Sequence, residues 1–166
     1  MNIASAPVLT LDEAAELAAS QRAAGRVVVL ANGVFDLMHP GHIRLLEAAR
    51  AEGDLLIVAV SSDRVVRDNK GPARPVLPEA ERAELLAALA SVDAVLISDD
   101  PTPAAVIQRI QPAVLVRGDG DPDTATETEG VRTVRVAPVP RCRGGVVAVA
   151  ETTQDRLFRH CRHRHA

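Results

Sequence analysis

The chain has 166 residues, of which 47% are hydrophobic and 25% are charged, a composition typical of one globular domain with its own core. The net charge of −3 and the absence of Trp and Tyr argue against a nucleic-acid-binding protein, which needs a basic surface and stacking side chains. No apolar stretch approaches the roughly 20 residues that cross a bilayer. The N-terminus lacks the basic start and apolar core of a signal peptide, so we expect a cytoplasmic protein.

The first part of the chain predicts alternating helices and strands. Thr10-Leu-Asp-Glu13 is a capping box that opens a helix, which Gly25 closes. Residues 26–31 and 54–61 are apolar runs of strand length, and a helix over about 41–52, ended by Gly53, lies between them. Because these runs are apolar at consecutive positions, they favour parallel strands that are covered on both faces.

The pattern continues in the second part of the chain. Residues 61–78 are polar and contain three prolines and a glycine, which predicts a loop with room for one helical turn. Helices are expected over 78–90 and 103–110, and strands over 92–98, 113–117 and 131–136. Residues Gly118-Asp119-Gly120 end the fourth of these strands.

Alternating strands and helices with short connections predict an α/β fold with a doubly wound, Rossmann-like parallel sheet. We expect a single domain over residues 1–166, with an N-terminal helix in 1–25, a core in 26–137 and a divergent C-terminal part in 138–166. Residues 138–151 predict either a turn with an extra strand or a mobile loop, and the histidine-rich segment 154–166 predicts a final helix.

The stretch NGVFDLMHPGH, residues 32–42, leaves the carboxyl end of a predicted strand and enters a helix. Ligands of parallel sheets gather at such ends, and a helix N-terminus offers N–H groups and a positive dipole to an anion. Pro40 suits the first helical position, and Gly41 lets a ligand approach the backbone closely. His39 and His42 are three residues apart and project to the same side, so they predict a phosphate clamp.

Two other interpretations of the histidine pair stay open at this point. One is a surface histidine at a helix start beside a buried histidine with a structural role. The other is a zinc site, but Cys142, Cys161 and the histidines of the tail show no suitable spacing for a third ligand. Neither a P-loop nor a Gly-x-Gly-x-x-Gly fingerprint is present, and the two cysteines suit incidental reduced thiols.

Lys70 is the single lysine among the 19 lysines and arginines. A GC-rich coding bias explains the excess of arginine but not why one lysine remains. Lys70 therefore indicates a position that needs a compact, rotatable ammonium, with chance as the alternative.

These features together resemble the cytidylyltransferase-like nucleotidyltransferases, whose signature is His-x-Gly-His. The resemblance covers about residues 27–136 and rests on NGVFD and HPGH, on KGPARPV, on Glu81-Arg82 and Val92-Asp93, and on PAVLVRGD at 112–119. Within the superfamily, residues 70–76 and 99–118 are most similar to the D-glycero-β-D-manno-heptose 1-phosphate adenylyltransferases.

The resemblance implies an enzyme that transfers AMP from ATP to a sugar 1-phosphate, with heptose 1-phosphate as the expected acceptor, giving an ADP-sugar and pyrophosphate. The alternatives are a cytidylyltransferase for glycerol 3-phosphate or another small phosphate, and a non-catalytic nucleotide-binding module. The implied partners are ATP and a sugar phosphate, without nucleic acid or membrane, and Mg²⁺ is expected on the triphosphate. Homodimers are common among similar proteins, which makes a homodimer a candidate assembly.

The resemblance also implies roles for individual residues. Three are catalytic and would hold the triphosphate: His39, His42 and Lys70. Two would bind the acceptor: Asp36, near the acceptor sugar or metal, and Arg74. Those expected to bind the nucleotide are Asn32, Gly33, Phe35, Gly41, Arg117, Gly118, Asp119, Thr152 and Thr153. The chain departs from the family where Glu151 precedes the threonine pair and where no Gly-Asp-Tyr follows residue 118, which leaves the nucleobase and the acceptor open.

Overall fold

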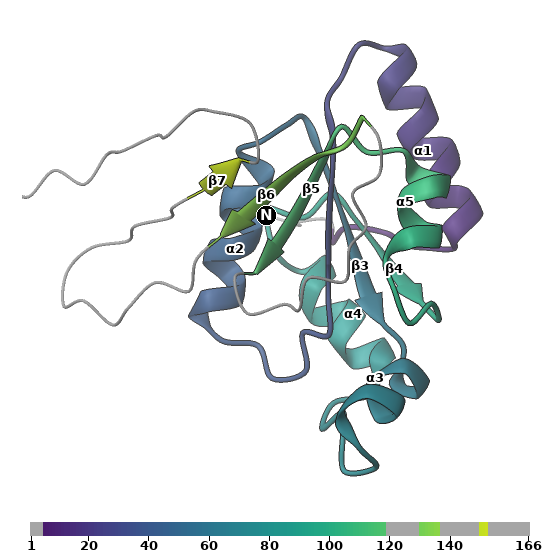
Figure 1. Cartoon of the computed structure of the whole chain (residues 1–166), viewed down its shortest axis with the longest axis vertical. Helices are drawn as coiled ribbons and strands as arrows, with labels where there is room; N and C mark the ends of the chain where they lie inside the picture. The colour runs from purple at the N-terminus through teal and green to yellow at the C-terminus, as the bar shows by residue number, and fades with distance from the viewer. Residues whose placement is uncertain (1–4, 119–129, 137–149, 153–166) are drawn as a thin grey trace, which may run out of the picture.

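The computed structural model describes residues 5–118, 130–136 and 150–152. One sheet runs through the molecule, and helices cover both of its faces (Figure 1). The elements in chain order are β1 (Val8–Leu9), α1 (Leu11–Ala23), β2 (Val28–Gly33), α2 (Pro40–Arg50), β3 (Leu55–Ser61), α3 (Asp63–Lys70), α4 (Glu79–Ala87), β4 (Ala94–Ser98), α5 (Ala104–Ile110), β5 (Val114–Gly118), β6 (Arg132–Val136) and β7 (Ala150–Thr152).

The strand order is β1-β4-β3-β2-β5-β6-β7, and every neighbouring pair is parallel except β6 and β7. From β2 the chain moves outward through β3 and β4, and then returns to place β5 on the other side of β2. This confirms the predicted α/β fold with a doubly wound parallel sheet. The order switches between β2 and β5, the position at which such sheets bind ligands beyond the carboxyl ends of their strands.

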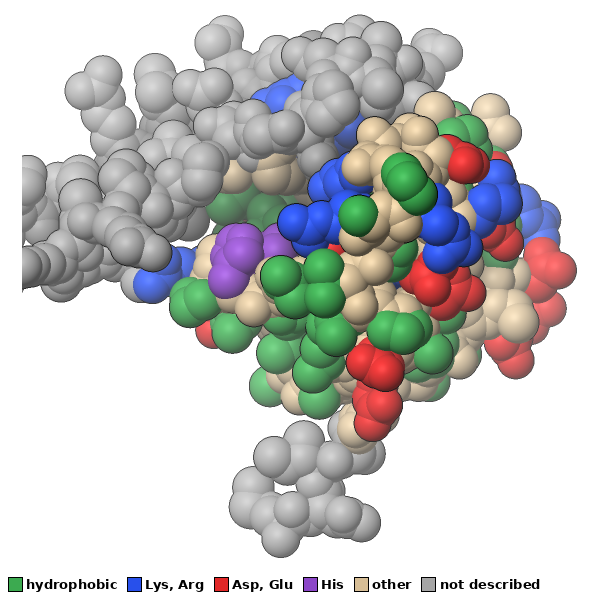
Figure 2. Space-filling model, turned by 90° about the horizontal axis from the view of Figure 1, so that it is seen from below, with side chains coloured by type: hydrophobic (Ala, Val, Ile, Leu, Met, Phe, Trp, Pro, Cys, Tyr) green, Lys and Arg blue, Asp and Glu red, His purple; other side chains and the backbone are tan. Residues whose placement is uncertain are grey.

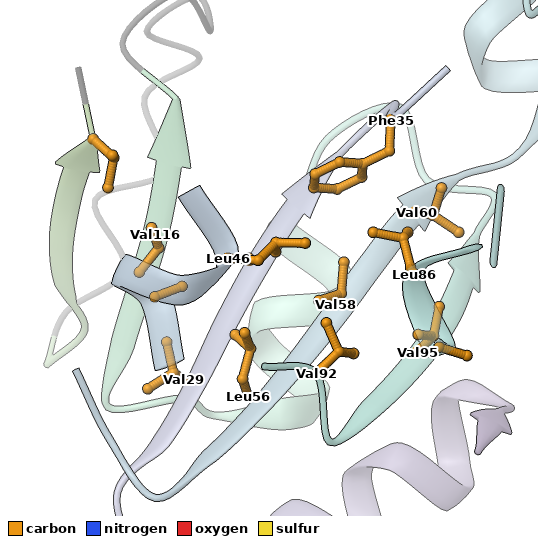
Figure 3. Packing of buried hydrophobic residues seen from close by; sticks show 14 of the residues in the cluster. Val29, Phe35, Leu46, Leu56, Val58, Val60, Leu86, Val92, Val95 and Val116 are labelled. Carbon is orange, nitrogen blue, oxygen red and sulfur yellow. The ribbon is translucent and has the colours of Figure 1, made fainter. Parts of the chain in front are cut away.

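The consecutive apolar residues of the central strands are buried on both faces of the sheet. In β2, Val28 and Leu30 pack with the residues of α1 and α5, whereas Val29 and Ala31 pack with those of α2 and α4. All four side chains are fully buried. Figure 3 shows the second of these layers, in which Leu46 lies between Val116 and Val58. Burial on both faces is why these strands lack the polar alternation of a half-exposed sheet.

The start of α1 forms as the sequence predicts. The Glu13 N–H donates to the Thr10 hydroxyl at 3.3 Å, and the Thr10 N–H donates to the Glu13 carboxylate at 2.8 Å. These reciprocal bonds satisfy donors that a helix N-terminus otherwise leaves unpaired. Gly25 follows the helix with a φ of 76°, a conformation that glycine adopts without strain.

The prediction of a loop over residues 61–78 was wrong in part, because its first half is the helix α3. Ser62 caps this helix by accepting from the Val65 N–H, and Val65 and Val66 are buried. The two buried valines supply the packing that stabilises a short helix of otherwise polar residues. The sequence also gave no sign of β1, a two-residue edge strand that pairs with β4.

At the C-terminal side, β7 coincides with the end of the segment for which an extra strand was one of two alternatives. Thr152 therefore belongs to a strand antiparallel to β6. The predicted final helix and the histidine-rich tail lie outside the described residues. Within the described part of the chain, no helix is long and apolar enough to cross a membrane.

Candidate functional site

The motif of residues 32–42 lies at the switch in strand order. Asn32 and Gly33 end β2, a loop follows, and His39 is the N-cap residue of α2. Gly118 ends the neighbouring strand β5 at the same edge of the sheet. A cavity of about 240 Å³ opens there, lined by Asn32, Gly33, Val34, Phe35, Asp36, Leu37, His42, Leu45, Lys70 and Gly118.

The two histidines of the motif stack on each other. Their ring centroids are 3.8 Å apart, with an angle of 25° between the ring planes. His39 is exposed, and its Nδ1 accepts a hydrogen bond from the Gly41 N–H at 3.1 Å. Figure 2 shows histidine side chains at the surface of this face, with basic side chains beside them. The prediction that both imidazoles lie on one side of the helix start is thus confirmed in geometry.

The start of α2 offers fewer free N–H groups than the sequence led us to expect. Pro40 has none, the Gly41 N–H donates to His39 Nδ1, and the N–H groups of His42 and Ile43 donate to the His39 carbonyl. The positive end of the helix dipole still favours an anion here. The Gly41 N–H, however, is already bound to the His39 imidazole and is not free to bind that anion. An anion at this helix start would therefore be bound by side chains more than by backbone N–H groups.

His42 lies deeper than His39, and its surroundings favour the neutral imidazole. Burial lowers the pKa of His42, and the nearby charges of His39 and Lys70 lower it further. Its Nδ1 is buried and makes no hydrogen bond within the described structure. A neutral imidazole near pH 7 can donate one hydrogen bond to a phosphate and gains a proton readily once negative charge arrives.

The aromatic ring of Phe35 packs against the His42 imidazole. The ring meets the imidazole edge-on, with centroids 5.3 Å apart and an angle of 65°. Phe35 is buried and has a φ of 49°, in the left-handed region that bulky residues seldom occupy. Gly33 allows this close turn, because a Cβ at residue 33 would lie 3.0 Å from the Phe35 ring. Backbone strain of this kind concentrates at ligand sites.

Lys70 reaches the cavity from another part of the chain. It is the last residue of α3, it is exposed, and it lines the same cavity as His42. Lys70 follows His42 by 28 positions in the sequence. Both residues line one cavity because α3 follows β3, the neighbour of β2 in the sheet. The single lysine of the chain therefore lies where an ammonium can contact an anion beside the histidines.

Asp36 and Arg74 were both predicted to contact the acceptor, and the structure brings them into contact with each other. A nitrogen of the Arg74 guanidinium lies 2.8 Å from one Asp36 oxygen. The other oxygen accepts from the N–H groups of Val76 at 2.7 Å and Leu77 at 3.1 Å. Burial would raise the pKa of Asp36, but the bonds from Leu77, Arg74 and Val76 and the Arg74 charge together hold it lower. Asp36 thus ties the loop of residues 71–77 to the motif.

Sequence reasoning assigned no role to Arg82, the largest fully buried side chain of the described residues. It projects from the inner face of α4, next to the buried Ala83. Two signals were available: Glu81-Arg82 is one of the pairs that carry the family resemblance, and Arg82 is a basic residue on the apolar face of a predicted helix. Its contacts reach three segments around the cavity.

Only some of the remaining predicted residues can be placed relative to the cavity. Arg117 is buried near the end of β5, and Gly118 lines the cavity. Asp119 and Thr153 lie outside the described residues, and Thr152 is described only as backbone of β7. Among the described residues, no group of three or more His, Cys, Asp or Glu side chains is arranged to hold a metal ion.

The geometry can bind a polyphosphate. The His42 imidazole and the Lys70 ammonium line a cavity at the positive end of α2, and His39 stacks on His42. Asp36 is the one carboxylate among the described residues that line this cavity, and it accepts from three donors. Such an arrangement neutralises charge on phosphate oxygens without supplying a covalent nucleophile.

Comparison with known proteins agrees with the family resemblance seen in the sequence. The cytidylyltransferase-like family model matches residues 30–152. The bifunctional protein HldE of Koribacter versatilis is 52% identical over 116 residues, covering 70% of this chain and 24% of that protein. HldE of Geotalea uraniireducens is 47% identical over 113 residues, with coverage of 68% and 23%. The chain therefore spans about a quarter of the length of these curated relatives.

Among solved structures, the lipopolysaccharide core biosynthesis protein from Thermoplasma volcanium GSS1 is similar, with a TM-score of 0.62 and 27% sequence identity. The match covers 70% of this chain and 100% of that one.

Proposed function

The chain belongs to the cytidylyltransferase-like family, and from this premise we propose that it transfers AMP from ATP to a sugar 1-phosphate, with heptose 1-phosphate as the expected acceptor. The observation that carries the proposal is that His42, on which His39 stacks, lines one cavity together with Lys70. The similarity to HldE proteins and to a lipopolysaccharide core biosynthesis protein supports an acceptor from carbohydrate metabolism. We expect this reaction in the cytoplasm.

In the proposed reaction, an oxygen of the acceptor phosphate forms a bond to the α-phosphorus of ATP. The bond from that phosphorus to the oxygen bridging the α- and β-phosphates breaks, and pyrophosphate leaves with the bonding electrons. The protein's task is alignment and charge stabilisation. His39 and His42 hold the triphosphate and donate to oxygens that gain charge, and the Lys70 ammonium meets the same oxygens from α3.

Mg²⁺ fits this site as a companion of the triphosphate and not as an ion held by protein carboxylates. Asp36 is the only carboxylate among the described residues that line the cavity, and both of its oxygens accept hydrogen bonds, from Arg74, Val76 and Leu77. Mg²⁺ commonly binds through substrate phosphates and retained waters. Bound in this way, it would neutralise charge on the phosphates.

A second hollow supports an acceptor rich in hydroxyl groups. It has a volume of about 40 Å³ and lies beyond the ends of β2, β3 and β4, lined by Asn32, Ala59, Ser61, Ser98, Asp100, Pro101, Thr102, Pro103 and Val106. Asn32 lines both hollows, and its Oδ1 is buried and makes no hydrogen bond within the described structure. Three hydroxyls, one carboxylate and one amide can exchange hydrogen bonds with the hydroxyl groups of a sugar, which an apolar acceptor lacks.

The test is a panel of the four common nucleoside triphosphates against heptose 1-phosphate, other sugar phosphates and glycerol 3-phosphate, with Mg²⁺ and pyrophosphate release as the readout. We expect turnover with ATP and heptose 1-phosphate. His42→Ala and Lys70→Ala should each lower kcat by roughly a hundredfold or more, because each removes a donor to developing charge. Arg67→Ala is the matched control, since Arg67 is an exposed basic residue of the same helix α3 and does not line the cavity.

The other outcomes separate the alternatives. Turnover with CTP and glycerol 3-phosphate would replace the proposal by the cytidylyltransferase. ATP binding by calorimetry without pyrophosphate release from any pair would indicate a non-catalytic nucleotide-binding module.

A further inference from the structure

Arg82 is a buried cation that the proposed chemistry does not use directly. It lies in α4, and its side chain has 0% exposure. Arginine is almost never fully buried unless its charge and its donors are paired. Its partners therefore indicate what it does.

The guanidinium makes four hydrogen bonds. Nε donates to the Leu77 carbonyl at 3.0 Å, and one terminal nitrogen donates to the carbonyls of Val34 at 2.6 Å and Ser61 at 2.7 Å. The other terminal nitrogen donates to the Asp63 carboxylate at 2.7 Å, which also forms the ion pair. Four of its five N–H groups are thus accounted for.

These partners belong to the three segments that surround the nucleotide cavity. Val34 is part of the motif loop and lines the cavity directly. Leu77 ends the loop whose amides bind Asp36. Ser61 ends β3, and Asp63 begins α3, the helix that carries Lys70 at its other end.

The junction of α3 and α4 gives this network a firm base. The Asp63 N–H donates to the Glu79 carboxylate at 2.6 Å, so the first turns of the two helices are joined twice, by Glu79 and by Arg82. The eight residues of α3 form a rigid helix about 12 Å long, with Asp63 at its start and Lys70 at its end. A small change at its start therefore displaces Lys70 at its end.

We infer that Arg82 is a positioning residue that fixes the distance between the histidine pair and Lys70 by binding the motif loop, the start of α3 and the end of the 71–77 loop at once. The inference deepens the proposed function and rests on it, since the groups that Arg82 positions are those proposed to hold the triphosphate. Arg82 itself does not line the cavity.

Only the shape of a guanidinium satisfies this arrangement. Its donors form a flat, rigid fork, whereas a lysine ammonium presents three donors from one atom and cannot span the same four partners. Arg82→Lys therefore keeps a positive charge beside Asp63, but it cannot donate to the carbonyls of Val34, Ser61 and Leu77 at the same time. Arg82→Met removes both the charge and the donors.

The experiment compares Arg82→Lys, Arg82→Met and Leu56→Ala in the full chain. Leu56 is fully buried near the start of β3, and Figure 3 shows it at the opposite end of the sheet from Phe35. It controls for a general loss of stability. Each variant is assayed well below its own melting temperature for kcat and KM with ATP and the acceptor, for ATP affinity by calorimetry, and for amide hydrogen exchange.

We expect Arg82→Lys to lower kcat by roughly a hundredfold, because a displacement of about 1 Å in a catalytic group has an effect of this size. The amides of Val76 and Leu77 should exchange faster, and ATP affinity should fall. Leu56→Ala should lose at least as much thermal stability while kcat and the exchange of these two amides stay within about twofold of wild type.

The inference fails if Arg82→Lys is folded and keeps wild-type kcat and amide protection, or if Leu56→Ala loses as much kcat. It also fails if both Arg82 variants are unfolded at the assay temperature, because Arg82 is then a stability element alone. If the wild type turns over no substrate pair, the proposed function fails by itself, and the amide exchange of residues 76 and 77 still decides whether Arg82 positions the loop.

Discussion

His39 has two structural tasks at the start of α2, and both constrain the residue two positions later. Its ring stacks on His42, and its Nδ1 accepts from the Gly41 N–H. A Cβ at residue 41 would lie 2.8 Å from His39 Cε1 and 2.9 Å from Nδ1. A side chain at residue 41 would therefore have to displace the His39 imidazole, and glycine leaves this ring in its stacked position.

We predict that Gly41→Ala displaces the His39 ring, which weakens ATP binding and lowers kcat about tenfold or more. The free energy of unfolding should change little. The measurement is a double-mutant cycle in kcat with His39→Ala. If the alanine acts only through the ring, the double variant should be no slower than His39→Ala alone. Additive losses would show that Gly41 matters for another reason.

The Asp36 carboxylate holds the loop of residues 71–77 to the motif, in addition to the bonds of Arg82 to Leu77 and Val34. Asp36 accepts from the Arg74 guanidinium and from the Val76 and Leu77 amides, so this side chain helps to fix a segment that begins next to Lys70. Because the pKa of Asp36 is lowered below its ordinary 3.8, its contribution to stability is complete above pH 3.8 and is lost as the pH falls below that value.

At the scale of elements we predict that Asp36→Asn loosens this loop, since a neutral amide removes the ion pair and replaces one acceptor oxygen by a donor. Trypsin should then cleave after Lys70 faster than in the wild type under native conditions. Asp68→Asn is the matched control, because Asp68 is an exposed carboxylate of α3 whose ion pair with Arg64 is also exposed. Equal cleavage rates in the two variants would contradict the role of Asp36.

The whole molecule depends on close contacts between the sheet and the connections around it. Gly53 follows α2, and a Cβ at this residue would lie 2.7 Å from the Val27 carbonyl oxygen and 2.6 Å from Val29 Cγ2. The sequence indicated Gly53 only as the end of a helix. The stricter requirement comes from the backbone next to β2, which is distant in sequence.

At the scale of the molecule we predict that Gly53→Ala lowers the free energy of unfolding by about 1–3 kcal/mol, because the added methyl group meets backbone that cannot move aside freely. The matched control is Gly118→Ala, since a Cβ at residue 118 has no neighbour within 4 Å among the described residues, and its change should stay within about 0.5 kcal/mol. Urea unfolding measures both values. A loss at Gly118 as large as that at Gly53 would refute the argument.

The fold class and most of the elements follow from local patterns in the amino-acid sequence. Consecutive apolar residues, a capping box and terminal glycines are local signals, and they correctly predicted α1, α2 and the strands β2 to β6. The motif of residues 32–42 predicted a phosphate site, and its two histidines lie side by side. The loop prediction over 61–78 was wrong in part because burial of Val65 and Val66 depends on neighbours that local sequence does not reveal.

Only the tertiary structure decided how the site is assembled. The contact between Asp36 and Arg74 and three of the four bonds of Arg82 join segments that are far apart in the chain, so no local pattern could indicate them. The same holds for the partners of the N–H groups at the start of α2, where the His39 side chain occupies a donor that the helix pattern left free. Periodicity and capping act within a few residues, whereas a binding site depends on which loops the sheet order brings together.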